Sequence, residues 1–227
     1  YLNELHYLFR SRHYAHGGAY GGASENGTCA TLHTMAVNGY GTASPDTRLE
    51  LNFYTGRVEV DGKYVTLDDG TPLQYMPLVV EQNLTASKYI ETAGARMKKY
   101  EVDRTAYSDG RMPDNDIVLY RYADVLLMKA EAKVRNGESG DEQLNAVRSR
   151  AGMPSLAATL ANILDERLLE LVWEGWRRQD MIRFGTYCAP YDIHTPSAAD
   201  KKRYTIVFPI PEKARELNPN LAQNPGY

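Results

Sequence analysis

Hydrophobic residues follow two different spacings along this chain, and the change falls near Asp116. After Asp116, apolar side chains recur three and four positions apart, as on the buried face of an amphipathic helix. Before it, helical spacing is weak, and 12 of the 18 glycines and 11 of the 17 tyrosines lie there. We expect residues 1–116 to form loops and short strands, and residues 117–227 to form a helical scaffold with a proline-rich tail.

Three helices are predicted in the second part. The first, over residues 119–135, places five apolar residues on one face: Tyr120, Ala123, Leu127, Ala130 and Val134. Gly137 ends it, and the spacing of Ser139 and Glu142 is that of a capping box, which predicts a second helix to residue 150. A third should span residues 161–173, with the amphipathic stretch 176–184 continuing or adjoining it. The first two form one helix pair of tetratricopeptide-like size.

Strand signals in the first part are short. Residues 49–54 alternate apolar and polar, which predicts a half-buried strand, and Asp61-Gly62 suits the tight turn of a hairpin over residues 57–67. Residues 16–41 are glycine-rich and turn-prone, residues 203–211 look extended, and residues 2–12 fit either a strand or a helix. The predicted fold class is mainly α: tetratricopeptide-like helix pairs with long loops and a small β-hairpin or sheet.

Composition narrows the possible partners. With 227 residues, 43% of them hydrophobic, the chain can bury the core of a single domain over residues 1–227. The formal charge is −3 and the basic residues are interleaved with acids, so we expect no nucleic-acid partner. No apolar run approaches the roughly 18–20 residues of a membrane-spanning helix, and the first residues lack the apolar core of a secretory signal.

A row of carboxylates at helical spacing raises the question of glycoside hydrolysis. Glu166, Glu170 and Glu174 stand at i, i+4 and i+8, whereas a glycosidase needs two carboxyl groups facing each other about 5–10 Å apart. Several arginines are near enough to pair with them and with Asp180: Arg167, Arg177, Arg178 and Arg183. We therefore expect an ion-pair network that anchors the helix, with the tryptophans of this segment packing beside it, and no catalytic residues.

Metal and redox signals are weak. His13, His16, Cys29 and His33 could form a zinc site, but their spacing matches no strong zinc pattern. The acidic pairs at residues 68–69 and 114–116 lack the spacing of a calcium loop and read as solvated turns. Cys29 and Cys188 could form a disulfide, but we expect both to be unpaired thiols. We predict no metal and no cofactor.

Four segments follow one another in the second half: residues 121–137 (RYADVLLMKAEAKVRNG), 166–185 (ERLLELVWEGWRRQDMIRFG), 208–214 (FPIPEKA) and 218–227 (NPNLAQNPGY). In this order and spacing they resemble the C-terminal part of the SusD/RagB family, the surface nutrient-binding lipoproteins of Bacteroidetes. The resemblance extends weakly upstream through residues 45–54 and 96–103. It implies a protein without enzymatic activity, exposed at the outer membrane, that captures an oligosaccharide, or a peptide, for a SusC-like TonB-dependent transporter.

The tyrosine-rich loops are where such a ligand would bind. Aromatic rings stack on the apolar faces of sugars, while amide and charged groups bond their hydroxyls. This predicts ligand-binding roles for Tyr14, Tyr20, Asn26, Asn38 and Tyr40. For each tyrosine the alternative is half-burial against the helices. No family motif carries these positions over, because ligand residues in the family vary with the glycan.

The resemblance also implies sequence beyond this chain. Family members carry a signal peptide and a lipid-modified N-terminal cysteine, whereas Cys29 follows polar residues and is a poor lipidation site. We therefore expect the chain to be the C-terminal part of a longer protein, with membrane association through an N-terminal lipid absent here. The alternative function is a helical-repeat protein-interaction module without a small-molecule ligand.

Overall fold

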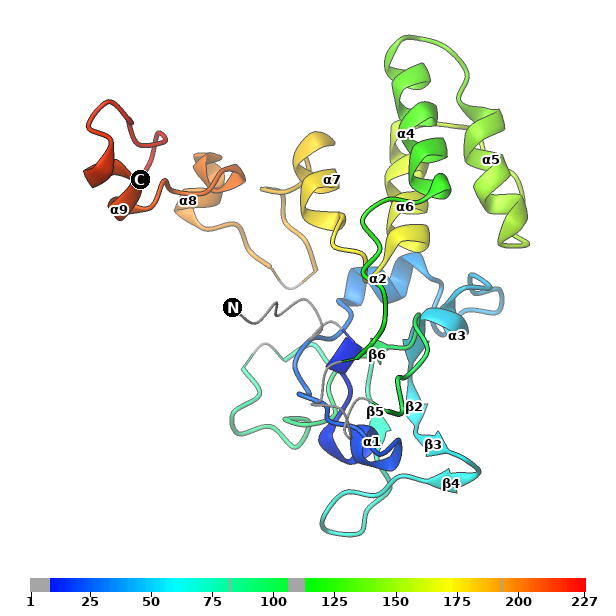
Figure 1. Ribbon diagram of the computed structural model, residues 1–227. Coiled ribbons are helices and arrows are strands. Elements are labelled where there is room, and N and C mark those ends of the chain that lie inside the picture. Colours follow the sequence, from blue (N-terminus) through cyan, green and yellow to red (C-terminus); the bar gives the residue numbers. More distant parts are fainter. Residues whose placement is uncertain (1–8, 82, 106–112, 193) are drawn as a thin grey trace. The chain divides into compact units, whose positions relative to one another are not determined.

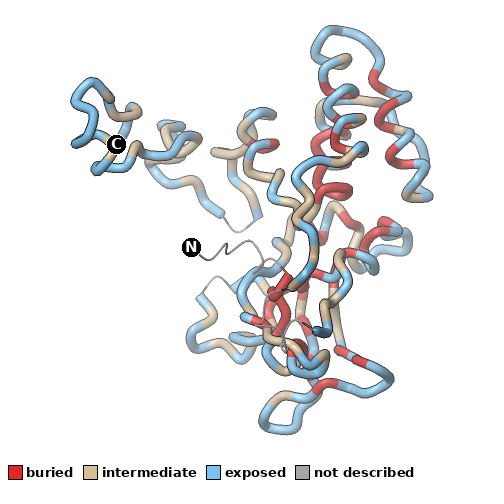
Figure 2. Tube along the Cα trace, viewed as in Figure 1, coloured by how far each residue is buried: buried red, intermediate tan, exposed pale blue. Residues whose placement is uncertain are grey.

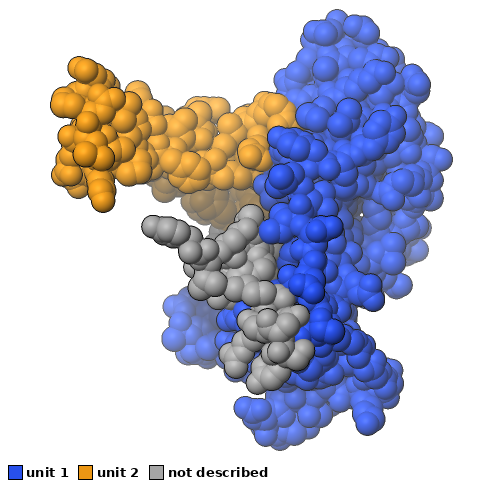
Figure 3. All heavy atoms as spheres, viewed as in Figure 1, with its two compact units in different colours: residues 1–176 blue, residues 177–227 orange. Residues whose placement is uncertain are grey.

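The computed structural model describes residues 9–81, 83–105, 113–192 and 194–227 (Figure 1). The chain forms two compact units, Tyr1–Trp176 and Arg177–Tyr227, which Figure 3 colours separately. The architecture is mainly helical with a few short antiparallel strands, which confirms the predicted fold class. The change of character near Asp116 lies within the first unit. The question of a strand or a helix over residues 2–12 falls mostly outside the described residues.

Three helices form the scaffold of the first unit: α4 (Tyr122–Arg135), α5 (Asp141–Arg150) and α6 (Leu160–Leu171). Helix α4 packs against both α5 and α6, and buried positions recur at helical spacing along all three (Figure 2). Leu127, Leu144 and Ile163 are fully buried at their contacts. The apolar periodicity therefore located the three helices, and Leu127 and Ala130 of the face predicted for α4 are fully buried.

The ends of these helices differ from the prediction in detail. Helix α4 begins at Tyr122, so Tyr120 lies outside it and is exposed. The predicted capping box at Ser139 is wrong, because Gly140 occupies the N-cap of α5. A Cβ at Gly140 would lie 2.7 Å from the carbonyl oxygen of Ala130 in α4, so only glycine allows the chain to cross this close.

Helix α6 is capped at its start and broken by backbone conformation at its end. The Thr159 hydroxyl accepts a hydrogen bond from the Asn162 amide. After Leu171 the chain leaves the helix, and Trp173 and Gly175 have φ angles of 68° and 81°. Residues 176–184 therefore adjoin the helix rather than continue it, since α7 (Arg177–Arg183) begins anew.

The predicted strand over residues 49–54 is wrong for most of its length. Residues 49–52 form a short helix, α3 (Leu49–Asn52), and only β1 (Phe53–Tyr54) is extended. Leu51, expected on the buried face, is 66% exposed. The glycine-rich stretch 16–41 likewise contains the end of α1 (Tyr14–Ala19) and all of α2 (Leu32–Val37), whose first turns are capped by the side chains of His13 and Thr31.

The strands form separate antiparallel pairs of two residues each. Strand β1 pairs with β6 (Arg96–Met97), β2 (Gly56–Arg57) with β5 (Gln74–Tyr75), and β3 (Glu59–Val60) with β4 (Lys63–Tyr64). The last pair is the predicted hairpin, and Asp61 and Gly62 both have the positive φ that its turn requires, 51° and 76°. Five side chains form the core beneath these pairs: Val58, Val60, Val65, Leu73 and Tyr75.

The second unit consists of short elements joined by proline-containing segments. Besides α7 it contains α8 (Ala198–Lys201), the 3₁₀ helix η2 (Tyr204–Ile206) and α9 (Glu212–Leu217). The segment 203–211, expected to be extended, therefore begins with a helical turn. Within the described residues, no helix is both long and apolar enough to cross a membrane.

Candidate functional site

A hollow of about 460 Å³ opens on the first unit beside α3, β1 and β2, and we call it the tyrosine groove. Its floor is apolar, formed by the buried residues Leu49, Phe53 and Val58. Two half-buried tyrosines, Tyr40 and Tyr54, stand in its wall. The full lining is Tyr40, Gly41, Leu49, Glu50, Phe53, Tyr54, Thr55, Arg57, Val58, Glu59 and Lys98.

Tyr54 is held in place from several directions. Its hydroxyl lies 3.3 Å from that of Tyr20, and its ring meets the edge of His16 at 4.6 Å between centroids. The Lys98 ammonium lies 5.6 Å from the centre of the same ring. Burial, followed by the hydrogen bond with Tyr20, raises the pKa of Tyr54, so the phenol stays neutral and can donate a hydrogen bond.

The charges around the groove balance. Glu50 and Glu59 contribute two carboxylates, Arg57 and Lys98 contribute two cations, and all four residues are exposed at the rim. Aromatic faces above an apolar floor, surrounded by donors and acceptors without a net charge, suit a neutral polyhydroxylated ligand. An anionic or cationic ligand gains no net attraction from this rim.

Of the three predicted tyrosines, one lines this groove, one contacts a groove residue, and the third does neither. Tyr40 lines it, and Tyr20 supports Tyr54 through the contact between their hydroxyls. Tyr14 begins α1, is 57% exposed, and packs its ring against His13. Tyr40 is therefore the one predicted tyrosine in the groove lining, while Tyr20 lies behind Tyr54 and Tyr14 contacts neither.

The two predicted asparagines use their amide groups within the protein. Asn26 accepts a hydrogen bond from Arg96 at 2.9 Å and donates one to the Glu91 carbonyl at 3.2 Å. Asn38 is fully buried and donates to the Thr34 carbonyl at 2.8 Å. Neither lines the groove. Their physical role in the structure is to hold loops, because their donors are satisfied locally.

Apart from Tyr40, the residues of the groove were not predicted from the sequence. In the alternation over residues 49–54, Tyr54 occupies a position where the pattern places polar residues. An aromatic side chain at such a position is the signal that could have identified it. Arg57 comes three positions after Tyr54 in the sequence. Lys98, which directly follows β6, comes more than 40 residues later, and no local pattern connects it with Tyr54 or Arg57.

A second hollow of about 320 Å³ adjoins the first, and we call it the apolar pocket. Its lining is Tyr40, Met76, Pro77, Leu78, Val79, Val80, Glu81 and Tyr89. Tyr40 is common to both hollows, so the two lie next to each other at this residue. Among the described residues that line the pocket, Glu81 alone is charged, which contrasts with the four charged residues of the groove.

A buried polar cluster supports the groove from behind. The Tyr75 hydroxyl accepts a hydrogen bond from the His13 amide at 2.9 Å and lies 3.0 Å from Nδ1 of His16. Burial, and then the charges of Arg12 and His13, lowers the pKa of His16 to about 3. His16 is therefore neutral at physiological pH, and its Nδ1 shares a hydrogen bond with the Tyr75 hydroxyl.

These contacts also show where the residues of the considered zinc site lie. His13 and His16 bond to groups around Tyr75, while Cys29 is exposed. No group of three potential ligands that could hold a metal ion occurs among the described residues. Cys29 and Cys188 are both free thiols.

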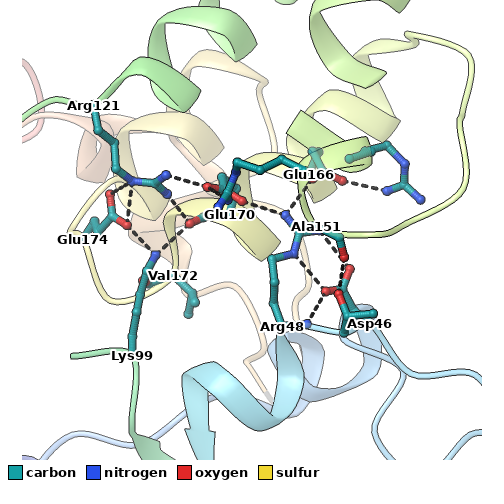
Figure 4. A network of polar contacts seen from close by, with 12 residues as sticks. Asp46, Arg48, Lys99, Arg121, Ala151, Glu166, Glu170, Val172 and Glu174 are labelled. Atoms are coloured by element: carbon teal, nitrogen blue, oxygen red, sulfur yellow. Dashed lines mark hydrogen bonds and ion pairs between the residues drawn. The ribbon is translucent and has the colours of Figure 1, made fainter. Parts of the chain in front are cut away.

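The carboxylate row of the second half forms a buried ion-pair network (Figure 4). Arg48 bonds both oxygens of Asp46 and one oxygen each of Glu166 and Glu170, all at 2.8 or 2.9 Å. The side chains of these three acids are 1–3% exposed. The predicted network is confirmed, and its acids face basic side chains instead of an open cleft.

The partners of the row come from distant elements, which the sequence analysis did not foresee. Arg148 pairs with Glu166, and Arg150 with Glu170. Arg121 pairs with both Glu170 and Glu174, and Lys99 donates to the carbonyls of residues 170 and 172. Arg167, one of the predicted partners, pairs with Asp124 of α4 at 2.7 Å. Arginines hold the acidic oxygens in place, so the row does not offer the opposed carboxyl pair of a glycosidase.

Comparisons with known proteins agree with this architecture. The model of the SusD family matches residues 12–227. The starch-binding protein SusD of Bacteroides thetaiotaomicron is 31% identical over 139 residues, covering 58% of this chain and 25% of that protein. SusD-like protein P38 of Formosa agariphila is 31% identical over 130 residues, covering 50% of this chain and 25% of that protein. The chain thus matches about a quarter of the length of these relatives.

The fold is shared with solved structures over most of the chain. A laminarin-binding SusD-like protein superposes with a TM-score of 0.60 at 24% identity, covering 90% of this chain and 39% of that one. NanU of B. fragilis gives a TM-score of 0.54 at 24% identity, covering 85% and 38%. Because the family model accounts for nearly all of the sequence, this chain belongs to the SusD family.

Proposed function

We propose that this protein captures an oligosaccharide at the cell surface and passes it, uncleaved, to a SusC-like TonB-dependent transporter in the outer membrane. The observation that carries the proposal is the tyrosine groove, where Tyr40 and Tyr54 stand above an apolar floor within a charge-balanced rim. Membership of the SusD family supports it, as does the curated relative that is named a starch-binding protein. Location and transporter rest on the family resemblance.

The groove favours a neutral oligosaccharide over other nutrients. Its two tyrosine rings supply stacking faces, and its carboxylates and cations supply acceptors and donors for hydroxyl groups. The Tyr54 phenol adds a donor that stays protonated at physiological pH. Malto-oligosaccharides are the first ligands to test because the relative SusD is named for starch.

Calorimetric titration of the full-length protein with a panel of oligosaccharides tests this function. We expect at least one to bind, and Tyr40→Ala to weaken its binding about 10- to 100-fold, as when an aromatic anchor is truncated. Tyr122→Ala is the matched control, because this tyrosine is 75% exposed on α4 and lines neither hollow. Equal effects of the two substitutions would refute the assigned site. Binding of peptides alone would refute the oligosaccharide.

The absence of cleavage is tested separately. Chromatography of the best ligand after incubation with the protein should recover it intact, because the arginines around Glu166 and Glu170 leave these acids no room to act on a sugar. Shortened products that disappear in a Glu170→Gln variant would overturn a binding role without catalysis.

A second candidate is a protein-interaction module built on the helix pair, and one surface favours it. Tyr122, Val125 and Met128 lie three positions apart on α4 and are 75%, 48% and 40% exposed. In this case Val125→Glu with Met128→Glu would abolish recovery of the transporter with the tagged full-length protein from outer membranes, while oligosaccharide affinity stayed unchanged. Loss of both activities together would point to misfolding, which circular dichroism detects.

A further inference from the structure

The apolar pocket differs in chemistry from the tyrosine groove that it adjoins. Its lining includes a continuous run of apolar residues, residues 76–80, together with Tyr89. The groove has four charged residues at its rim, whereas the described lining of the pocket includes one, Glu81. Since Tyr40 lines both hollows, a ligand that stacks on this residue in the groove lies beside the pocket.

An unmodified sugar is a poor occupant of this pocket. Each hydroxyl group that leaves water needs a new hydrogen-bond partner, and the aliphatic side chains of Leu78, Val79 and Val80 supply none. An apolar group has no such requirement and gains free energy by leaving water. The volume of about 320 Å³ is at the small end of ligand sites and fits one aromatic ring or a short acyl chain, not several sugar residues.

Backbone hydrogen bonds tie the two sides of the pocket together. The Met76 amide donates to the Thr92 carbonyl at 2.9 Å, and the Gly94 amide donates back to the Met76 carbonyl at 2.9 Å. The Ala93 amide donates to the carbonyl of Tyr89 at 2.9 Å. Met76 and Tyr89 are thereby fixed relative to each other, so the pocket exists before a ligand arrives and ordering it adds little cost to binding.

Two residues of its wall are unusually exposed for their type. Leu78 is 59% and Val80 63% exposed, although both are aliphatic and side by side at the mouth of a hollow. Contiguous exposed apolar side chains of this kind mark places that a ligand covers. The neighbouring groove identifies the rest of that ligand.

We propose that the apolar pocket binds an aromatic or short acyl ester substituent carried by the oligosaccharide whose sugar part lies in the tyrosine groove. This inference rests on the proposed function. The protein thus selects decorated oligosaccharides over plain ones: the groove recognises the sugar, and the pocket recognises the ester.

Competitive capture tests the proposal. The oligosaccharide that binds best in the calorimetric panel is mixed with a pool of its monobenzoyl esters, and the immobilised full-length protein retains part of the mixture for mass spectrometry. We expect at least one ester to be enriched about 10-fold over the free oligosaccharide, as burial of part of a ring predicts. The pool contains every ester position, so the outcome does not depend on guessing the right one.

Substitutions locate the effect. Leu78→Asn with Val80→Asn should remove the enrichment without changing the affinity for the free oligosaccharide, and both positions are exposed enough to accept asparagine without unfolding. Leu51→Asn, at a 66% exposed position outside both hollows, is the matched control and should keep the enrichment. Lys98→Ala, in the groove, should weaken both ligands equally.

The outcomes separate the two proposals. If the free oligosaccharide is retained and no ester is enriched, the pocket does not bind a substituent and the proposed function stands. If enrichment survives the double substitution in the pocket, the ester binds elsewhere and this inference is overturned. If neither ligand is retained, the proposed function itself fails.

Discussion

Arg48 offers the sharpest test of how this fold is held together. Its guanidinium group bonds three buried acids, two from α6 and Asp46 from the turn before α3. In an Arg48→Met variant the two glutamates keep other partners, since Arg148 still bonds Glu166 and Arg121 still bonds Glu170. Asp46 loses the side chain that neutralises it while its own side chain stays 3% exposed.

The expected loss of stability comes from Asp46, because the two glutamates keep arginine partners while Asp46 loses Arg48. Removing one member of a buried ion pair costs about 3–5 kcal/mol because the other is left charged without compensation. Arg150→Met is the control: it also removes an arginine from Glu170, but this side chain is 64% exposed and its loss should cost less than about 1 kcal/mol. Adding Asp46→Asn to Arg48→Met should recover about 1–2 kcal/mol by removing the stranded charge.

The pH dependence gives an independent check. Burial alone would raise the pKa of Asp46, but hydrogen bonds and the charge of Arg48 outweigh it, and the pKa is lowered from 3.8. The pKa of Glu170 is also lowered from 4.5, because Arg121, with Arg48 and Arg150, outweighs burial. A carboxyl group whose folded pKa is depressed stabilises the fold above its unfolded pKa, and this contribution is lost as pH falls through the folded value. The penalty of Arg48→Met should therefore shrink below about pH 4.

Urea unfolding of the full-length protein and its variants, followed by circular dichroism at pH 7 and at pH 3.5, measures both effects. The reasoning is refuted if Arg48→Met costs no more than Arg150→Met at pH 7, or if its penalty is the same at the two pH values. A failure of Asp46→Asn to recover stability would show that the stranded carboxylate is not the source of the loss.

Three further predictions concern packing and protonation. Gly140→Ala should lower the free energy of unfolding by about 1–3 kcal/mol in urea titrations, because its Cβ would meet the α4 backbone, whereas Gly27→Ala, which meets nothing within 4 Å, should change it by less than about 0.5 kcal/mol. Leu127→Ala should cost about 2–5 kcal/mol at a fully buried position of α4, and Met128→Ala, next to it and 40% exposed, less than about 1 kcal/mol; equal losses would contradict the assigned inner face. His16 should stay neutral in NMR titrations from pH 8 to pH 5, and a midpoint near 6.5 would contradict its burial against Tyr75.

Features that depend on neighbours in sequence could be predicted from it. The inner face of α4 follows from the spacing of Leu127 and Ala130, because helix packing requires apolar residues on one side. The hairpin over β3 and β4 follows from Asp61-Gly62, since few residue pairs adopt positive φ at both positions. Both arguments need only a few consecutive residues.

Features that depend on distant partners could not be predicted. The alternation over residues 49–54 is typical of a strand, yet residues 49–52 form the helical turn α3. Arg48, at the N-cap of this turn, bonds Glu166, which lies 118 positions later in the sequence. Among many tyrosines, composition could not show that Tyr40 and Tyr54 line one groove or that Tyr20 contacts Tyr54. Asn38 looked like a loop residue because nothing local indicates its burial.

The scaffold that identifies the family and the groove that we propose binds the ligand are mechanically joined. Arg48, held by Glu166 and Glu170, is the N-cap of α3, and α3 carries Leu49 and Glu50 into the groove lining. At the other end of α3, Asn52 accepts a hydrogen bond at its carbonyl from the indole N–H of Trp173, at 3.0 Å. Trp173 lies two residues after the end of α6.

The same segment reaches the second end of the groove. Tyr40 and Trp173 both pack on the cluster of Met35, Leu49, Phe53 and Ala95, so the tyrosine that lines both hollows rests on the same core as the tryptophan. The buried charges therefore hold the backbone on which the groove residues stand, without touching a ligand. On this reasoning the residues at the rim can be exchanged to suit another glycan while the network stays unchanged, which explains how a scaffold signature can identify a family whose ligands differ.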